Sequence, residues 1–149
     1  MPDFEEFRLE LSDVANEKDR AYIHNQLKAF NDRVSAHHRE IRPVGPQPLD
    51  ILLRDAGGGI VGGLIASTYW DWLDIEDFWL AEGLRGKGYG RRLLRIAEEE
   101  AQRRGCMRVK LQTFSFQART FYEKMGYNVV GELVDYPPGE RFYWMRKNM

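Results

Sequence analysis

The sequence predicts a single α/β domain that covers residues 1–149. Its length suits one domain with one hydrophobic core. With 43% hydrophobic and 30% charged residues, the composition is typical of a soluble globular protein rather than a disordered chain. Strand-like and helix-like patterns alternate along the chain, without an internal repeat or a linker. This alternation favours the α/β class.

The N-terminal third predicts a short strand, a long helix and a loop. FRLEL at 7–11 is typical of a strand. From 17 to 34, apolar residues recur at spacings of four, three and four, as in an amphipathic helix, and Asn16 suits the N-cap. Residues 35–48 contain three prolines and a glycine, so we expect a loop there. The apolar stripe of the helix consists of Ile23, Leu27, Phe30 and Val34.

The middle of the chain predicts a hairpin, a strand and a second long helix. Apolar segments at 49–55 and 60–70, joined by a run of glycines, have the pattern of a β-hairpin. A strand over 75–81 leads into a glycine-rich turn and then a helix that ends near Arg104. Gly105 suits the position after that helix. The expected i,i+4 ion pairs of the helix are Glu99–Arg103 and Glu100–Arg104.

The C-terminal third predicts three strands and a short helix, which brings the expected number of strands to about seven. MRVKLQT at 107–113 alternates between apolar and polar residues. The short helix stops at Gly126, and two strands then flank the turn YPPGE. One face of the short helix carries Ala118, Phe121, Tyr122 and Met125.

Charge and targeting signals exclude several classes of function. The formal net charge is −1, so nothing favours nucleic acid or an anionic membrane as a partner. Cys106 is the only cysteine, which excludes an intrachain disulfide and suits a reducing cytoplasm. The acidic start MPDFEEF is unlike a signal peptide, and the apolar run at 57–66 is about half the roughly 20 residues of a membrane helix. We therefore expect a cytoplasmic protein.

The stretch EGLRGKGYGRRLL at 82–94 predicts an anion site. A strand that breaks into glycines and then a helix directs free N–H groups and the positive end of a helix dipole at one point. The Walker phosphate loop is excluded because Lys87 precedes Gly88 instead of a Ser or Thr. The dinucleotide fingerprint is excluded because its third glycine is missing. The turn is therefore expected to bind an anion, but through neither of these two phosphate-binding motifs.

Two motifs resemble the GNAT superfamily of N-acetyltransferases. Arg85-x-x-Gly88-x-Gly90, between a strand and a helix, resembles the family's acyl-CoA loop. SFQARTFYEKMGY at 115–127 resembles its second signature at the expected distance downstream, as in a bacterial branch of the superfamily. The resemblance implies a twisted, mixed and mostly antiparallel central sheet flanked by helices. It also implies acetyl-CoA as cosubstrate and direct transfer to an amine in a ternary complex. We expect no metal, because His24, His37 and His38 do not have the spacing of metal ligands.

The resemblance assigns cofactor contacts to three segments. The backbone of the strand at Trp79 and Leu80 is expected to pair with the pantetheine arm, and the glycine turn to wrap the pyrophosphate. Ser115 stands where the family often has an asparagine that contacts the pantetheine arm, so it either contacts the cofactor or caps the short helix. The residues of the turn are Arg85, Gly86, Lys87, Gly88, Tyr89, Gly90 and Arg91.

Acetyl transfer to an amine needs a proton acceptor and a proton donor. An alkyl amine with a pKa near 10.4 is neutral in only roughly 1 molecule in 2,500 at pH 7, so a base is required. Tyr122 matches the family tyrosine that protonates the departing thiolate. For the base, we expect Glu76 first and Asp74 second, both on the strand before the turn. A bulge in this strand would change that order.

The acceptor is the least determined part of the site. Tyr69, Trp72 and Tyr136 are candidates for an aromatic pocket that suits a small cationic amine. An enzyme that acetylates a protein or peptide, and a non-catalytic module that binds acyl-CoA, remain the alternatives. A homodimer is compatible with the sequence, which does not determine the oligomeric state.

Overall fold

A computed structural model of the chain describes residues 7–149. It contains two compact units, residues 1–43 and 44–149, which are described separately. The acidic start of the chain, which argues against a signal peptide, lies almost entirely outside the described residues. The expectation of one domain over the whole chain stays a prediction.

The first unit contains helices α1 (Glu17–Val34) and α2 (Ala36–Ile41). The Asn16 side chain accepts hydrogen bonds from the amides of Lys18 and Asp19 at 3.0 and 3.2 Å, which confirms the predicted cap of α1. The predicted apolar stripe of α1 is not buried, because its four side chains are 49–68% exposed.

Two predictions for the first unit are wrong. Residues 36–41 form α2 instead of a loop, and the Ser35 hydroxyl accepts a hydrogen bond from the amide of His38 as its N-cap. Residues 7–11 form no strand. A strand needs backbone partners on a neighbouring strand, and no described segment pairs with this one.

The second unit is a six-stranded sheet with two helices on one side. The strand order is β1-β2-β3-β4-β6-β5, and every pair is antiparallel except β3–β4, which is parallel. The α/β class and the mixed, mostly antiparallel sheet are confirmed, with six strands in place of about seven. The elements are β1 (Gln47–Arg54), β2 (Ile60–Tyr69), β3 (Trp72–Leu80), the 3₁₀ turn η1 (Glu82–Leu84), α3 (Tyr89–Arg103), β4 (Arg108–Phe114), α4 (Arg119–Lys124), β5 (Asn128–Val134) and β6 (Arg141–Asn148).

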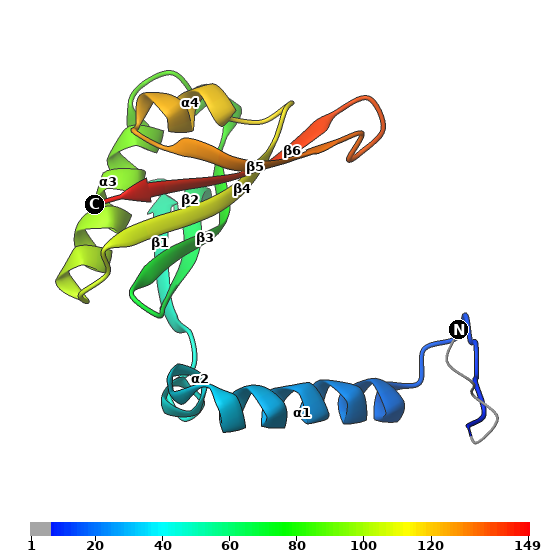
Figure 1. Ribbon diagram of the computed structural model, residues 1–149. Helices are drawn as coiled ribbons and strands as arrows, with labels where there is room; N and C mark the ends of the chain where they lie inside the picture. Colours follow the sequence, from blue (N-terminus) through cyan, green and yellow to red (C-terminus); the bar gives the residue numbers. More distant parts are fainter. Residues whose placement is uncertain (1–6) are drawn as a thin grey trace. The chain divides into compact units, whose positions relative to one another are not determined.

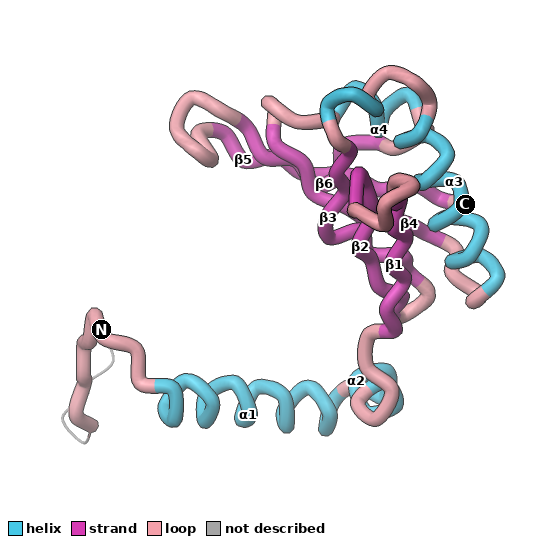
Figure 2. Tube along the Cα trace, turned by 180° about the vertical axis from the view of Figure 1, so that it is seen from behind, coloured by secondary structure: helices cyan, strands magenta, loops and turns pink. Residues whose placement is uncertain are grey.

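The core lies between the sheet and the helices α3 and α4, which lie on the same side of it (Figures 1 and 2). The alternation predicted for 107–113 is confirmed within β4, since Val109, Leu111 and Thr113 are buried, whereas Met107 precedes the strand and is exposed. The buried face of α3 also carries one charge, Glu98. Its carboxylate accepts hydrogen bonds from Lys147 Nζ at 2.7 Å and from the Tyr127 hydroxyl at 3.1 Å.

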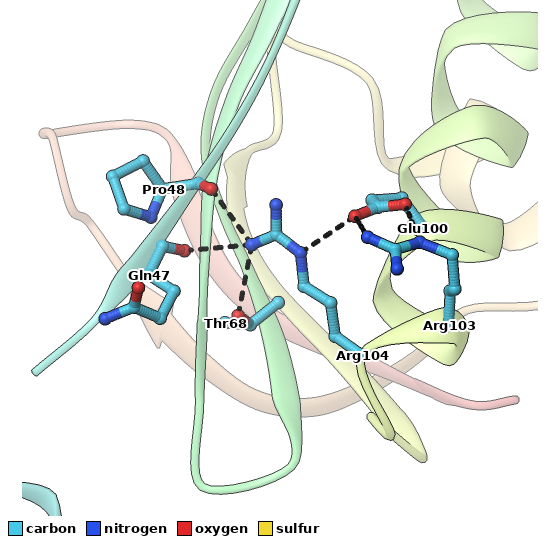
Figure 3. Close-up of polar contacts among 6 residues, drawn as sticks. All are labelled: Gln47, Pro48, Thr68, Glu100, Arg103 and Arg104. Carbon is cyan, nitrogen blue, oxygen red and sulfur yellow. Dashed lines mark hydrogen bonds and ion pairs between the residues drawn. The ribbon is translucent and has the colours of Figure 1, made fainter. Parts of the chain in front are cut away.

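The C-terminal end of α3 is joined to the sheet by Arg104 (Figure 3). Its Nε donates to Glu100 at 3.0 Å, which confirms one predicted i,i+4 pair, and its Nη1 donates to the Pro48 carbonyl at 2.9 Å. The other predicted pair is wrong, because Arg103 contacts Glu100 at 2.6 Å instead of Glu99. The two guanidiniums lower the pKa of Glu100 to about 2, and the hydrogen bond from Arg103 is the largest cause.

Candidate active site

Strands β3 and β4 run side by side at their beginnings and then separate. Trp72–Ile75 of β3 pair with Arg108–Leu111 of β4, and β4 then continues to Phe114 with only β6 beside it. The Ala81 amide donates to the Val61 carbonyl at 2.8 Å, so the backbone groups of Ala81 face β2. Because backbone groups alternate along a strand, those of Trp79 also face β2, whereas those of Phe78 and Leu80 face the side that β4 has left. Of the two residues predicted to pair with a pantetheine arm, only Leu80 therefore directs its backbone groups away from β2.

Arg85 turns its side chain onto this edge. Its Nε donates to the Leu80 carbonyl at 3.1 Å. The sequence placed Arg85 at the start of the phosphate-binding turn and contained no signal for this second contact. In this structure the guanidinium of Arg85 fixes the end of β3 against the turn that follows it.

Glu76 is a β-bulge at the point where the two strands separate. Ile65 of β2 pairs with Asp77 and its neighbour Ala66 pairs with Ile75, so Glu76 is the extra residue of β3. A bulge reverses the faces of the residues that follow it. Phe78 accordingly lies on the core side, with its ring centroid 6.1 Å from that of Phe121. Glu76 therefore does not share a face with Phe78 and Leu80, as regular alternation would require. We expected a bulge in this strand to change the order of the two candidate bases, but this bulge leaves Glu76 as the more exposed carboxylate, so the order stays Glu76 before Asp74.

The two candidate bases have different surroundings. Asp74 lies within the paired part of β3 and forms an ion pair with Lys110 at 3.0 Å. Glu76 is exposed and accepts a long hydrogen bond, 3.5 Å, from the Ser67 hydroxyl on β2. The structure forms no ion pair to Glu76 within residues 7–149. Glu76 thus has an accessible carboxylate where the strands diverge. Its neighbour Ser67, a buried serine in an apolar strand, was not predicted from the sequence.

The glycine turn presents a continuous row of unused main-chain donors. Within residues 7–149, none of the six N–H groups from Gly86 to Arg91 forms a hydrogen bond of normal geometry with a protein acceptor. The first amide of this helix to do so is that of Arg92, which donates to the Gly88 carbonyl at 3.1 Å. These donors lie at the positive end of α3, a 15-residue helix. The arrangement suits an anion with several oxygens, such as a diphosphate.

Gly86 and Gly88 are required here by the backbone itself. Their φ angles are +72° and +87°, a region that side chains disfavour, and a Cβ on either would meet nothing within 4 Å. The space beside them is thus open to a ligand. Gly90 differs, since a Cβ there would lie 3.5 Å from both Leu80 and Phe121, an ordinary contact.

A shallow hollow lies beside the start of α3 and is lined by three of its arginines. It has a volume of about 310 Å³. Lys87 and Arg91 form no ion pair in the described part of the chain, so their charges are available to a ligand. The residues that line the hollow are Gly88, Arg91, Arg92, Arg95, Ile96 and Glu99.

Tyr122 on α4 is buried beside the end of β3. Its ring centroid lies 5.2 Å from that of Phe121 and 5.7 Å from that of Tyr127, and Phe121 in turn packs on Phe78. Burial raises the pKa of Tyr122 to about 12, so the hydroxyl stays protonated at neutral pH. No described residue forms a hydrogen bond with this hydroxyl. A buried, protonated and unengaged phenol can donate a proton to a developing anion.

Ser115 is bonded within the protein. Its hydroxyl accepts from the Arg141 amide at 2.9 Å and donates to the Glu140 carboxylate. It does not cap α4, whose N-cap is Ala118 without a side-chain hydrogen bond, so that expectation is wrong. Ser115 instead ties the end of β4 to the start of β6, and its contact with a cofactor stays a prediction.

The three predicted acceptor residues do not lie together. Tyr69 and Trp72 flank the β2–β3 turn, at the opposite end of β3 from the glycine turn, about 26 Å away at a rise of about 3.3 Å per residue. Trp72 and Asp74 line a separate hollow of about 400 Å³, in which the guanidinium of Arg146 lies 4.8 Å from the Trp72 ring. Tyr136, by contrast, lies against Phe114 at the end of β4.

The described residues show no cluster of His, Cys, Asp and Glu side chains suited to a metal ion. None of the helices described between residues 7 and 149 is both long and apolar enough to span a bilayer.

Comparison with known proteins agrees with this geometry. The model of the acetyltransferase (GNAT) family matches residues 11–127. The chain is 36% identical over 121 residues to blasticidin-S acetyltransferase of Streptomyces morookaense, which covers 76% of this chain and 89% of that protein. It is 33% identical over 137 residues to an acetyltransferase of Agrobacterium fabrum strain C58, covering 92% and 96%. A crystal structure of an acetyltransferase from Bacillus cereus superposes with a TM-score of 0.81 at 28% identity, covering 94% and 98%. The resemblance drawn from the two motifs is confirmed: the chain belongs to the acetyltransferase (GNAT) family and is an acyltransferase.

Proposed function

We propose that this protein transfers an acetyl group from acetyl-CoA to a primary amine of a small molecule, directly and in a ternary complex. The observation that carries the proposal is the row of six free N–H groups at the start of α3, immediately after a strand on whose open edge the Leu80 amide lies. The turn takes the diphosphate of CoA, and Lys87 and Arg91 add positive charge beside it. The open edge of β3 pairs with the pantetheine arm, as an added strand would.

Glu76 and Tyr122 each carry out one of the two proton transfers. The amine loses a proton through water to Glu76, and its nitrogen attacks the thioester carbonyl carbon. The C–S bond then breaks, and the departing thiolate takes a proton from the hydroxyl of Tyr122, which solvent later restores. Asp74 is the weaker candidate for the base, because Lys110 already neutralises its charge.

The choice of a small amine is supported by the name of one relative. The Streptomyces protein, at 36% identity, is a blasticidin-S acetyltransferase, so a related sequence modifies a small molecule. A protein substrate and a non-catalytic acyl-CoA module are the competing functions. A cytoplasmic location and a homodimer stay predictions.

The test measures thiol release from acetyl-CoA with panels of small amines, polyamines and peptides, together with calorimetric binding of CoA. We expect micromolar to millimolar CoA binding and turnover with at least one small amine. Turnover with peptides alone would replace the small amine by a protein substrate. Tight CoA binding without turnover on any panel member would favour the non-catalytic module, and absence of CoA binding would overturn the proposal.

A further inference from the structure

Three aromatic rings form a surface at the end of β4, which we call the aromatic shelf: Phe114, Phe116 and Tyr136. The Phe114 ring is stacked on that of Phe116, with centroids 5.3 Å apart and planes 7° apart. It also lies nearly parallel to Tyr136, at 6.2 Å and 22°. Phe116 and Tyr136 are 61% and 53% exposed, so they are not part of the core. Exposed rings that are joined into one patch, as these two are through Phe114, are typical of a binding surface.

The shelf is held rigidly. The Ser115 amide donates to the Arg141 carbonyl at 2.8 Å, and its hydroxyl bonds both the Arg141 amide and the Glu140 carboxylate. The Tyr136 amide donates to the Glu140 carbonyl at 3.3 Å, which closes the turn that carries the Tyr136 ring. The Phe142 ring packs edge-on against both Phe114 and Tyr136, at 5.1 and 5.4 Å. Rings fixed in this way lose little entropy when a ligand stacks on them.

The shelf lies at the same edge of the sheet as the proposed cofactor turn. Because β3 and β4 are parallel, their carboxyl ends point the same way. The glycine turn follows β3, whereas Phe116 follows β4 and precedes α4, the helix that carries Tyr122. Both segments lie at the upper end of the sheet in Figure 1. The shelf is thus placed to contact a part of the acceptor away from its reacting nitrogen.

The charge beside the shelf is negative. Glu140 receives the Ser115 hydroxyl through one carboxylate oxygen and forms no ion pair within the described residues. The neighbouring Arg141 is neutralised by an ion pair with Glu132. Aromatic faces next to a carboxylate favour planar cations, through stacking, the attraction of a cation to a ring face, and direct charge pairing.

From this geometry we infer that Phe116, Tyr136 and Glu140 form an acceptor subsite for a planar, conjugated and positively charged group, of the amidinium or guanidinium type. The inference rests on the proposed function, because the subsite belongs to the same acceptor. It adds the chemical class of the substrate: an amine whose far end is a flat cation.

The test compares equilibrium binding of two small cations to the full chain in the presence of CoA: benzamidinium, which is planar, and cyclohexylammonium, which is not. Titration calorimetry or ligand-observed NMR gives both dissociation constants. We expect wild type to prefer benzamidinium by about tenfold, because only the planar amidinium can stack in parallel on a ring and donate two parallel N–H groups to a carboxylate. Phe116→Leu and Glu140→Gln should each remove most of this preference. Trp70→Leu, which removes an exposed ring at the opposite end of β3, is the matched control and should leave it unchanged.

The outcomes separate this inference from the proposed function. Equal binding of the two cations by wild type, or an unchanged preference in Phe116→Leu with a native circular dichroism spectrum, would overturn the subsite. A dimer in sedimentation equilibrium that Phe116→Leu dissociates, without benzamidinium binding to wild type, would assign the shelf to self-association instead. If no compound of the panels is acetylated but wild type still prefers benzamidinium, the acetyl transfer proposed above is refuted and the planar-cation site is retained.

Discussion

Two tyrosines in contact offer a sharp test of the proposed proton donor. Tyr122 and Tyr127 have ring centroids 5.7 Å apart, and both are buried. The Tyr127 hydroxyl donates to the carboxylate of Glu98, whereas no described residue bonds the hydroxyl of Tyr122. Removing the two hydroxyls one at a time therefore separates a catalytic role from a structural one.

Tyr122→Phe keeps the ring and its packing and removes only the hydroxyl. Loss of a general acid lowers kcat by about 10²–10⁴-fold, which corresponds to about 2.7–5.4 kcal/mol of barrier. The free energy of unfolding should change by less than about 1 kcal/mol, because no hydrogen bond is broken. The affinity for acetyl-CoA should stay the same. Burial raises the pKa of Tyr122 to about 12, so wild type should show no loss of kcat from ionisation of this group below about pH 11.

Tyr127→Phe is the control with the opposite expectation. It breaks a buried hydrogen bond to a charged group, so it should lower the free energy of unfolding by about 1.5–3 kcal/mol. Its kcat should stay near that of wild type at a temperature where the variant is folded. Steady-state thiol release and urea denaturation measure both quantities for both variants. Wild-type kcat in Tyr122→Phe would refute the proton-donor role, and an equal loss of kcat in Tyr127→Phe would show that the assay reports packing instead.

Further substitutions test the turn and the ion pairs. Gly88→Ala, at φ +87°, should cost about 1–2 kcal/mol and raise the dissociation constant for CoA, whereas Gly90→Ala should leave both nearly unchanged; calorimetry decides. Lys147→Met leaves the buried carboxylate of Glu98 without its cation and should lower the free energy of unfolding by about 3–5 kcal/mol in urea, and an unchanged midpoint would contradict this. The pKa of Glu100 is lowered from 4.5 to about 2, so its contribution to stability is present above pH 4.5 and is lost as the pH falls toward 2. Glu100→Gln should flatten the melting temperature in that range.

Local patterns were sufficient for much of the fold and for the elements that carry the proposed site. The glycine turn between a strand and a helix, the cap at Asn16 and the buried face of α4 depend on φ preferences and on side-chain periodicity, which neighbouring residues decide. Tyr122 was predictable because its position in the second motif and its place on the apolar face of a short helix coincide.

The missed features all depend on residues that are distant in sequence. FRLEL has the composition of a strand, but a strand forms only where another offers its backbone groups. Ser115 suited a helix cap, yet its hydroxyl bonds Glu140 and Arg141, which lie about 25 residues away. No local pattern shows that Arg85 turns back onto the Leu80 carbonyl.

The sequence alone was sufficient to identify the family and the turn with free amides, and it predicts Tyr122 as the proton donor. Which of the two candidate bases has the accessible carboxylate depends on contacts between strands, because the register of β3 against β2 makes Glu76 a bulge while Lys110 on β4 neutralises Asp74. The physical reason is that a shift of one residue between paired strands moves every following side chain to the other face of the sheet. That shift is a property of two strands together, and neither segment encodes it alone.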